Sequence, residues 1–439
     1  MSPSQHLQRL LPCVALTTLS LTAAAAPAAG ASPGEPMPEH CAATSGNLAG
    51  EWGGEWVASW SASPQPVWGP DFIFPTNIPE RIARQTIRQV ARLSLGGGRV
   101  RVELSNAYGT EPLRIGEARV ALASTDTQTV PGSDRLLRFG GQPEVTLPPG
   151  AAVLSDAVDL SVAPLASLAV SLYLPGPSRL DTFHWEGRRT AYIAEGNATA
   201  STRLAAPLTT PARIVLSSIL VDAVAPSSAV VALGDSITDG AGATPETDRR
   251  WPDFLAERLA PANVALLNAG ISGARVLRDS MGVNALARFE RDVLAQPGVK
   301  TVILLMGIND IGWPGTLFAP DEPALHAQAL IAGYRQLVAR AHSRGVRIVG
   351  ATLTPFEGAL QGTPLGNYYN DDKEALRQQV NAWIRTGGAF DAVVDFDALL
   401  RDPARPTRML PAYDSGDHLH PGDHGYRAMA QAIDLNLLR

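Results

Sequence analysis

The chain has 439 residues, of which 45% are hydrophobic and 18% charged, so it predicts two or three folded domains and excludes wholesale disorder. The net charge is −6 and no run of Lys and Arg occurs, which argues against a nucleic-acid-binding protein. Cys13 and Cys41 are the only cysteines, too few for a disulfide scaffold or a cysteine zinc site.

The amino terminus has the order of a secretory signal peptide. Arg9 precedes an apolar run over residues 10–21, and small residues follow. The run is shorter than the roughly 20 apolar residues of a membrane-spanning helix, and the alternative is a disordered Ala/Pro-rich tail. We assign residues 1–31 to a signal peptide and 32–49 to a flexible linker. We expect a secreted or periplasmic protein whose mature form has no integral membrane segment.

Residues 50–225 are predicted to form a β-sandwich or jelly-roll accessory domain. Polar and apolar residues alternate strictly over residues 99–104, as in a strand with one buried face. Gly96–Gly98 directly before this run predicts a hairpin turn. Further short apolar runs, separated by turn residues, favour a sandwich and lie at residues 113–122, 144–147, 168–174 and 214–224.

Residues 228–439 alternate between apolar runs and helical stretches, which predicts an α/β domain with a parallel sheet and helices on both faces. The apolar runs, typical of strands buried on both sides, are residues 229–233, 264–267, 301–306, 347–352 and 392–395. The predicted helices are residues 251–259, 285–294, 322–343, 373–385 and 421–438. Ligands of such sheets bind beyond the carboxyl ends of the strands, so the residues that follow each run are the candidates.

Ser236 follows the first run, within Gly234-Asp235-Ser236. On a strand-to-helix turn its hydroxyl is exposed and its N–H is a free donor at a helix start. An ordinary helix-capping serine is the alternative. A phosphate loop is excluded because no Lys follows, and an α/β-hydrolase elbow because position 238 is Thr rather than Gly.

The second and third runs are followed by further candidate hydrogen-bond donors. Residues 268–273 end on Gly273, where a glycine lets the backbone approach a ligand and offer its N–H. Residues 307–310 contain Asn309, whose side-chain amide can donate into the same crevice. Taken singly, each segment is weak evidence for a site. An ordinary strand-to-helix turn is the alternative for residues 268–273, and an Asn-Asp pair such as Asn309-Asp310 is most often a turn or cap.

Asp417 and His420 stand three residues apart before the last predicted helix. At this spacing a carboxylate can hold Nδ1 of the imidazole and leave Nε2 free as a base. Two alternatives stay open. One is a solvated polar loop, and the other is a metal site made of His418, His420, Asp423 and His424.

Together the four segments resemble the blocks of the SGNH/GDSL hydrolase superfamily, in the family's order, over residues 228–439. The whole chain also resembles a secreted two-domain subgroup with an N-terminal β domain, through residues 104–109. The family has Leu where this chain has Ile237, a conservative difference. The resemblance implies a three-layer α/β/α domain with a five-stranded, flavodoxin-like parallel sheet.

The resemblance also implies the roles of the site residues. Ser236 is expected to be the nucleophile, His420 its base and Asp417 the residue that orients the base. The N–H groups of Ser236 and Gly273 and the amide of Asn309 are the expected oxyanion donors. No metal or organic cofactor is required. Further substrate contacts are expected from four residues: Asp235, Trp313, Tyr368 and Tyr369.

We therefore expect an enzyme that hydrolyses carboxylic esters of acetyl or short acyl groups, on a small molecule or a polysaccharide. Longer, aromatic or polymer esters are the alternative. A non-catalytic glycan-binding protein and a metal-dependent hydrolase are the rival classes, and chelator sensitivity separates the latter. Residues 50–225 are expected to wall one side of the crevice without a catalytic group, since His184 stands alone beside Trp185 as an exposed pair.

Overall fold

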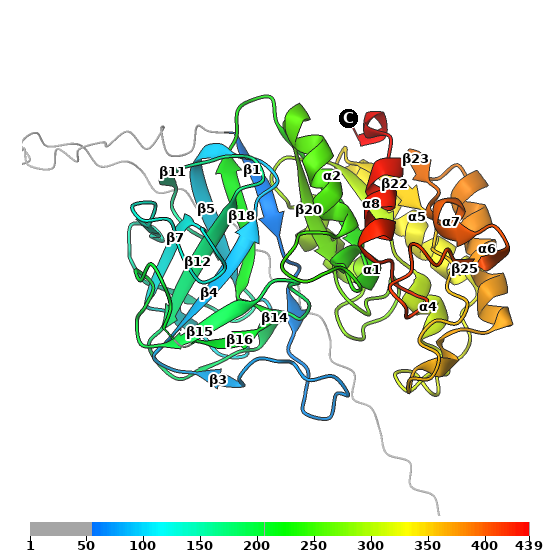
Figure 1. Ribbon diagram of the computed structural model, residues 1–439, viewed down its shortest axis with the longest axis horizontal. Coiled ribbons are helices and arrows are strands. Elements are labelled where there is room, and N and C mark those ends of the chain that lie inside the picture. Colours follow the sequence, from blue (N-terminus) through cyan, green and yellow to red (C-terminus); the bar gives the residue numbers. More distant parts are fainter. Residues whose placement is uncertain (1–54, 206, 439) are drawn as a thin grey trace, which may run out of the picture. The chain divides into compact units, whose positions relative to one another are not determined.

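The computed structural model describes residues 55–205 and 207–438, so the expected signal peptide and linker lie outside the described residues. The described residues belong to one compact unit. Within it, an antiparallel β-rich region reaches Asp222, and a region of alternating strands and helices begins at Ser228 (Figure 1). Among the described residues, no helix has the length and apolarity that crossing a membrane would require.

Two antiparallel sheets build the β-rich region. The first contains β1 (Trp56–Ser61), β18 (Leu216–Asp222), β5 (Gly97–Ser105) and β10 (Ala152–Leu154), with β11 (Val158–Val162) also on β5. The second contains β16 (Leu208–Thr210), β15 (Ala191–Glu195), β4 (Gln85–Arg92), β12 (Ser167–Leu174), β7 (Glu117–Leu122) and β8 (Arg135–Leu136). Shorter strands are β2 (Gln65–Pro66), β3 (Arg81–Ile82), β6 (Leu113–Ile115), β9 (Val145–Leu147), β13 (Ser178–Arg179), β14 (Thr182–His184) and β17 (Arg213–Ile214).

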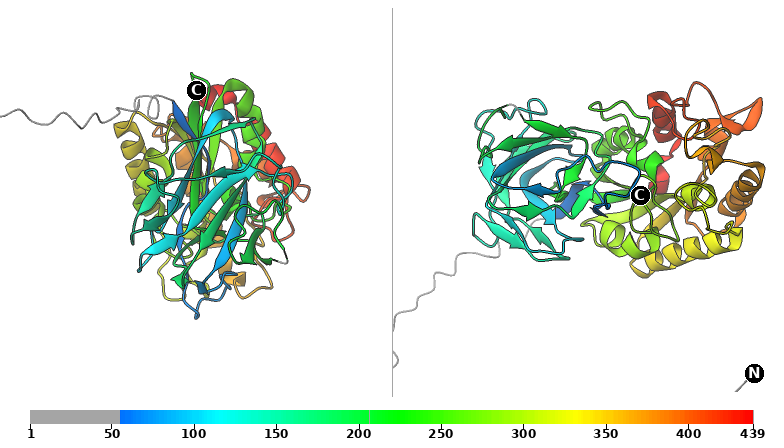
Figure 2. Two further views of the ribbon diagram at one scale, coloured as in Figure 1. Left: turned by 90° about the vertical axis from the view of Figure 1, so that its left-hand side faces the viewer. Right: turned by 90° about the horizontal axis from the view of Figure 1, so that it is seen from below.

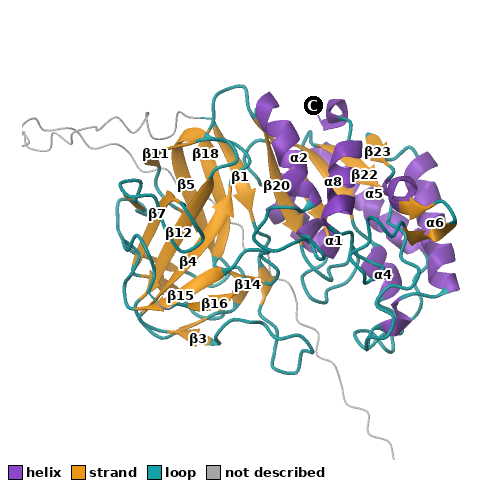
Figure 3. Ribbon diagram, in the orientation of Figure 1, coloured by secondary structure: helices purple, strands orange, loops and turns teal. Residues whose placement is uncertain are grey.

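Alternation along the strands fills the space between these two sheets. Val100, Val102 and Leu104 of β5 share one face and are fully buried, as are Ile87 of β4 and Leu168 of β12 in the other sheet. All five belong to one apolar cluster. The predicted β-sandwich is confirmed, and Figure 3 shows its strands beside the helical region.

The predicted hairpin at Gly96–Gly98 is wrong. Strand β4 belongs to the second sheet and β5 to the first, so the chain crosses between sheets at this point instead of turning back. Gly97 already pairs with Val162 of β11. A Cβ at Gly96 would overlap the Val162 carbonyl oxygen. The glycine therefore permits a close backbone approach at the crossing.

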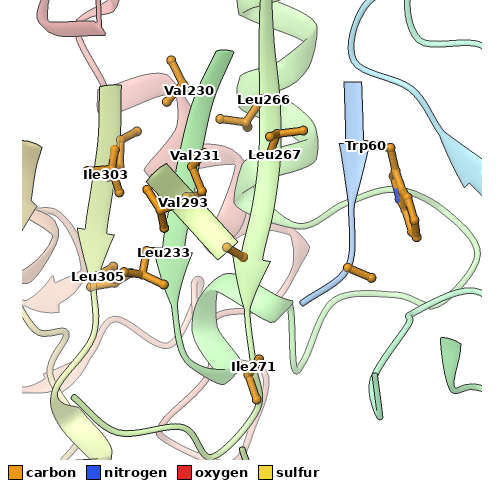
Figure 4. Close-up of a cluster of buried hydrophobic side chains, with 14 of the residues drawn as sticks. Trp60, Val230, Val231, Leu233, Leu266, Leu267, Ile271, Val293, Ile303 and Leu305 are labelled. Carbon is orange, nitrogen blue, oxygen red and sulfur yellow. The ribbon is translucent and has the colours of Figure 1, made fainter. Parts of the chain in front are cut away.

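A parallel sheet with the order β20-β19-β21-β22-β23 forms the centre of the second region. Its strands are β19 (Ser228–Gly234), β20 (Val264–Gly270), β21 (Val299–Leu305), β22 (Arg347–Ala351) and β23 (Ala392–Val394). Counted along the chain this is the order 2-1-3-4-5, so the predicted flavodoxin-like sheet is confirmed. Its side chains, among them Val231 and Leu267, fill the core drawn in Figure 4.

Helices cover both faces of this sheet, as two groups seen in Figure 2. Helix α2 packs on α8 and α8 on α7, whereas α3 and α6 pack on α5. The bounds are α1 (Ser236–Asp239), α2 (Trp251–Leu259), α3 (Ala285–Phe289), α4 (Ile308–Gly312), α5 (Ala327–Ser343), α6 (Asp371–Thr386), α7 (Phe396–Leu400) and α8 (Asp423–Ala432). A π-helical turn (Glu290–Leu294) continues α3, and single 3₁₀ turns are Ala260–Ala262, Gly366–Tyr368 and Leu435–Leu438.

Three helices are shorter than predicted. Helix α3 ends at Phe289 rather than 294, because a π-helical turn takes up Glu290–Leu294. Helix α5 begins at Ala327 rather than 322, with His326 as an extended N-cap residue. Pro323 disfavours a helical conformation at residue 322. Helix α8 spans Asp423–Ala432 rather than 421–438. Pro421 pairs with Asp414 in a short β-bridge, and Leu435–Leu438 form a separate 3₁₀ turn.

The β-rich region covers the open edge of the parallel sheet. Strand β20 is an edge strand, and β1 lies beside it (Figure 1). The Leu266 N–H donates to Ser94 Oγ at 3.1 Å, and Ser61 Oγ donates to the Asn268 carbonyl at 3.4 Å. These bonds occupy edge groups that would otherwise be open to another strand.

Candidate active site

Ser236 occupies the turn between β19 and α1. It is the first residue of α1, and Asp235 caps the helix by accepting the Ile237 N–H at 3.0 Å. The side chain is largely buried, with 7% of the residue exposed. Its Oγ lies 2.7 Å from Nε2 of His420, although the two residues are far apart in the sequence. The hydroxyl can therefore pass its proton to the imidazole.

Asp417 holds the other side of the His420 ring. Its Oδ2 lies 2.6 Å from Nδ1, and its Oδ1 accepts the backbone N–H groups of His420 at 2.8 Å and Leu419 at 2.9 Å. Burial acts to raise the pKa of Asp417, but these hydrogen bonds and the charge of His420 outweigh it and hold the pKa well below its usual range. The ionised carboxylate requires a proton on Nδ1, so the Nε2 lone pair faces Ser236.

Gly273 lies in a loop that is fixed on both sides. The preceding residue, Ser272, donates its N–H at 2.9 Å and its Oγ at 2.8 Å to Asp239 Oδ2. The Gly273 carbonyl accepts from Ser280 Oγ at 2.9 Å and Trp313 Nε1 at 3.2 Å. Gly273 has φ +73°, and a Cβ there would overlap Met281 Sδ, so any other residue would strain the backbone and displace Met281.

Asn309 presents an amide of fixed orientation in α4. Its Nδ2 donates to the Ala274 carbonyl at 3.0 Å, and its Oδ1 accepts the Tyr368 hydroxyl at 2.7 Å. Only 2% of the residue is exposed. The second Nδ2 hydrogen is thus left for a ligand. Within the described residues, the N–H groups of Ser236 and Gly273 also have no hydrogen-bond acceptor, which is the property that an oxyanion site needs.

These five predicted residues border a single cavity of about 260 Å³. The parallel-sheet region adds Ala241, Gly242, Ser272, Met281, Trp313, Leu360, Leu365, Tyr368 and Leu419 to its walls, and the β-rich region adds Phe74, Trp185, Glu186 and Arg188. The four β-region residues carry no motif, and sequence reasoning did not find them. A larger cavity, of about 440 Å³ beside Lys373, contains none of the five.

The four expected substrate contacts divide into two pairs. Trp313 and Tyr368 line the cavity. Asp235 does not, because it lies beneath the turn as the cap of α1 with 1% exposed, where burial raises its pKa to about 7. Tyr369 packs against Phe356, with ring centroids 5.0 Å apart, and lies outside the cavity lining.

The residues proposed as alternative metal ligands bind separate partners. His418 Nδ1 lies 2.5 Å from Asp414 Oδ2. Asp423 accepts the N–H and the hydroxyl of Thr244, both at 2.8 Å. No group of three His, Cys, Asp or Glu side chains in the described part of the chain is arranged to share an ion.

His184 differs from the sequence expectation. It was expected as an exposed residue without a partner, but only 5% of it is exposed. Its Nε2 lies 3.0 Å from Oδ1 of Asp239 in α1, and its Nδ1 lies 3.1 Å from the Ser63 carbonyl. The partner is a residue of the other region, 55 positions away, so no local pattern could indicate it.

Comparison with known proteins identifies the parallel-sheet region. Residues 232–428 match the sequence model of the GDSL-like lipase/acylhydrolase family. A search of curated proteins gave no match. Among solved structures, the chain is similar to a GDSL-like lipase from Bacteroides thetaiotaomicron (19% identity, 48% of this chain and 87% of that chain, TM-score 0.36). It is also similar to an acetyl-xylooligosaccharide esterase from Geobacillus (24% identity, 48% of this chain and 95% of that chain, TM-score 0.34). A third similar structure is the M. smegmatis aryl esterase (15% identity, 48% of this chain and 100% of that chain, TM-score 0.35). Residues 232–428 therefore form a domain of the GDSL-like lipase/acylhydrolase family, which supports a serine ester hydrolase.

Proposed function

We propose that the protein hydrolyses esters of short acyl groups through an acyl-enzyme on Ser236. The observation that supports this proposal is the continuous chain from Ser236 Oγ to His420 Nε2 (2.7 Å) and from His420 Nδ1 to Asp417 Oδ2 (2.6 Å). Beside it lie the backbone N–H groups of Ser236 and Gly273, which have no acceptor among the described residues. A serine hydroxyl is a poor nucleophile until a neighbouring base takes its proton, and His420 is in place to do so.

The reaction runs in two halves. Ser236 Oγ attacks the ester carbonyl carbon while its proton passes to His420 Nε2, and the negative charge on the carbonyl oxygen is stabilised by the donors of Ser236, Gly273 and Asn309. The carbon–oxygen bond to the alcohol then breaks, and His420 returns the proton to the leaving oxygen. A water molecule, deprotonated by His420, attacks the acyl-enzyme, and the acid leaves as Ser236 regains its proton.

The size of the cavity favours a short acyl group. Its volume of about 260 Å³ has to hold parts of both the acyl and the alcohol groups. Its walls also suggest a second candidate, an ester of an aromatic alcohol or of a polymer. Phe74 and Trp185 stack at 5.4 Å and 23° and provide a flat apolar wall that suits an aromatic or sugar ring. We further propose export of the protein, on the basis of the signal-peptide pattern of residues 1–31.

Ser236→Ala and a graded ester panel test this proposal. Kinetics with acetyl, butyryl, octanoyl and lauroyl nitrophenyl esters should give the highest kcat/KM for acetyl or butyryl. Ser236→Ala should lower kcat by about 10⁶, since the nucleophile is lost. Ser343→Ala, which removes an exposed serine hydroxyl on α5, is the matched control and should behave as wild type. Retention of a tenth of the wild-type rate by Ser236→Ala would exclude the mechanism.

A further inference from the structure

Two buried residues of the β-rich region are connected to the loop that carries Gly273. His184 reaches it through Asp239, and Gln65 reaches it through Met281. We propose that His184 and Gln65 are positioning residues for the oxyanion site, so that the β-rich region holds the geometry in which the Gly273 N–H receives the developing charge. This inference rests on the proposed acyl-enzyme mechanism.

Asp239 transmits the position of His184 to the loop. Its Oδ2 accepts both polar hydrogens of Ser272, and its Oδ1 faces His184 Nε2 at 3.0 Å. Only 1% of Asp239 is exposed, so solvent cannot replace a lost partner. The Gly273 N–H belongs to the peptide bond that Ser272 begins. A displacement of Asp239 therefore displaces the oxyanion donor itself.

His184 connects Asp239 to the β-rich region through its two ring nitrogens. Both of its ring nitrogens face oxygens, the Ser63 carbonyl at 3.1 Å and the Asp239 carboxylate at 3.0 Å. A carbonyl oxygen only accepts, so Nδ1 carries a proton. The ring thus joins the Ser63 carbonyl of the β-rich region to the Asp239 carboxylate of α1, and this contact fixes Asp239 between the two regions.

Gln65 holds the other side of the same loop. Its Nε2 and Trp68 Nε1 both donate to the Met281 carbonyl at 2.8 Å, and its Oε1 accepts the Trp185 N–H at 2.9 Å. Gln65 is fully buried. The Met281 side chain fills the space in which a Cβ on Gly273 would lie. The Gly273 segment is therefore held between Asp239 and Met281, and each of these residues is bonded to the β-rich region.

The expected effect is a loss of turnover without a loss of binding. Complete removal of one oxyanion donor lowers turnover by roughly 10²–10³. His184→Ala displaces a donor rather than removing it, and we expect kcat to fall about tenfold with KM unchanged. Gln65→Met keeps the shape of the side chain and leaves Trp68 on the Met281 carbonyl, so a smaller fall in kcat, of about threefold, is expected.

The test compares an ester with its thionoester on both variants. Backbone N–H groups stabilise a developing negative charge on sulfur less well than one on oxygen, so the ester-to-thionoester ratio of kcat/KM reports the oxyanion site. The proposal predicts that this ratio falls in His184→Ala and Gln65→Met. Ser94→Ala is the matched control. It removes a buried hydrogen bond between the two regions, at Leu266 of β20, and should leave the ratio unchanged.

Three outcomes would overturn the inference: a wild-type kcat in His184→Ala, an equal loss on ester and thionoester, or the same fall of the ratio in Ser94→Ala. If His184→Ala does not fold, as judged by circular dichroism, the ratio measured on Gln65→Met decides. The proposed function fails by a different result, namely ester hydrolysis that survives in Ser236→Ala. The two failures are therefore distinguishable.

Discussion

Replacing Asn309 by Ala should remove one of the three oxyanion donors and little else from the cavity. One Nδ2 hydrogen is bonded to the Ala274 carbonyl, so a single hydrogen is left for the substrate. Loss of one such donor lowers kcat by roughly 10²–10³, or about 2.7–4 kcal/mol of transition-state stabilisation. KM should change little, because the donor acts on charge that appears only in the transition state. The fold should hold. The unpaired Tyr368 hydroxyl costs about 1–3 kcal/mol, whereas the free energy of unfolding of a native protein is typically about 5–15 kcal/mol.

Steady-state kinetics on a nitrophenyl acetate ester measure both constants, and urea denaturation measures the stability. Tyr368→Phe is the matched control. It removes the hydroxyl that donates to Asn309 Oδ1 but leaves the Ala274 carbonyl to hold the amide, so kcat should fall less than about tenfold. A kcat for Asn309→Ala within threefold of wild type would refute the role of this amide. Equal losses in the two variants would assign the effect to Tyr368.

Two further changes test the charged groups of the site. Asp417→Asn should lower kcat by about 10⁴ with KM nearly unchanged, because the amide can hold the wrong tautomer of His420. Steady-state kinetics measure both constants. A raised KM with an unchanged kcat would instead mean that Asp417 contacts the substrate. Asp235→Asn keeps an acceptor for the Ile237 N–H but cannot ionise. Burial raises the pKa of Asp235 from 3.8 to about 7, so wild type loses stability as pH rises through that range and the variant does not. Urea denaturation at about pH 4 and about pH 8 should show the variant gaining up to about 4 kcal/mol over wild type at the higher pH, and a difference that does not change with pH would contradict this.

The parallel sheet could be predicted from the sequence because its strands are buried on both faces and therefore appear as continuous apolar runs. All five runs became strands of that sheet, and α2 has the predicted bounds, Trp251–Leu259. The carboxyl ends of parallel strands meet at one edge, so Ser236, Gly273 and Asn309 could be placed in one crevice without coordinates. Local sequence was sufficient here because each candidate directly follows its own strand.

The parts that sequence did not predict depend on distant contacts. A hairpin and a crossing between sheets use the same local pattern at Gly96–Gly98, and only the pairing of β4 and β5 with other strands separates them. His184 gave no signal because its partner, Asp239, lies in the other region. Phe74 and Trp185 line the cavity for the same reason. They reach it through the packing of the two regions, and the local sequence of either region gives no sign of its contacts with the other.

Strand β20 would become an open edge in any chain shortened to residues 226–439. The Leu266 N–H and the Asn268 carbonyl would lose Ser94 and Ser61, and an apolar strand, Val264–Gly270, would be free to pair with a second copy of the chain. Recombinant truncation at this junction thus carries an aggregation hazard. An exchange of β-rich regions between related enzymes would need a transplanted region that brings its own hydroxyl donors and acceptors to the same two positions.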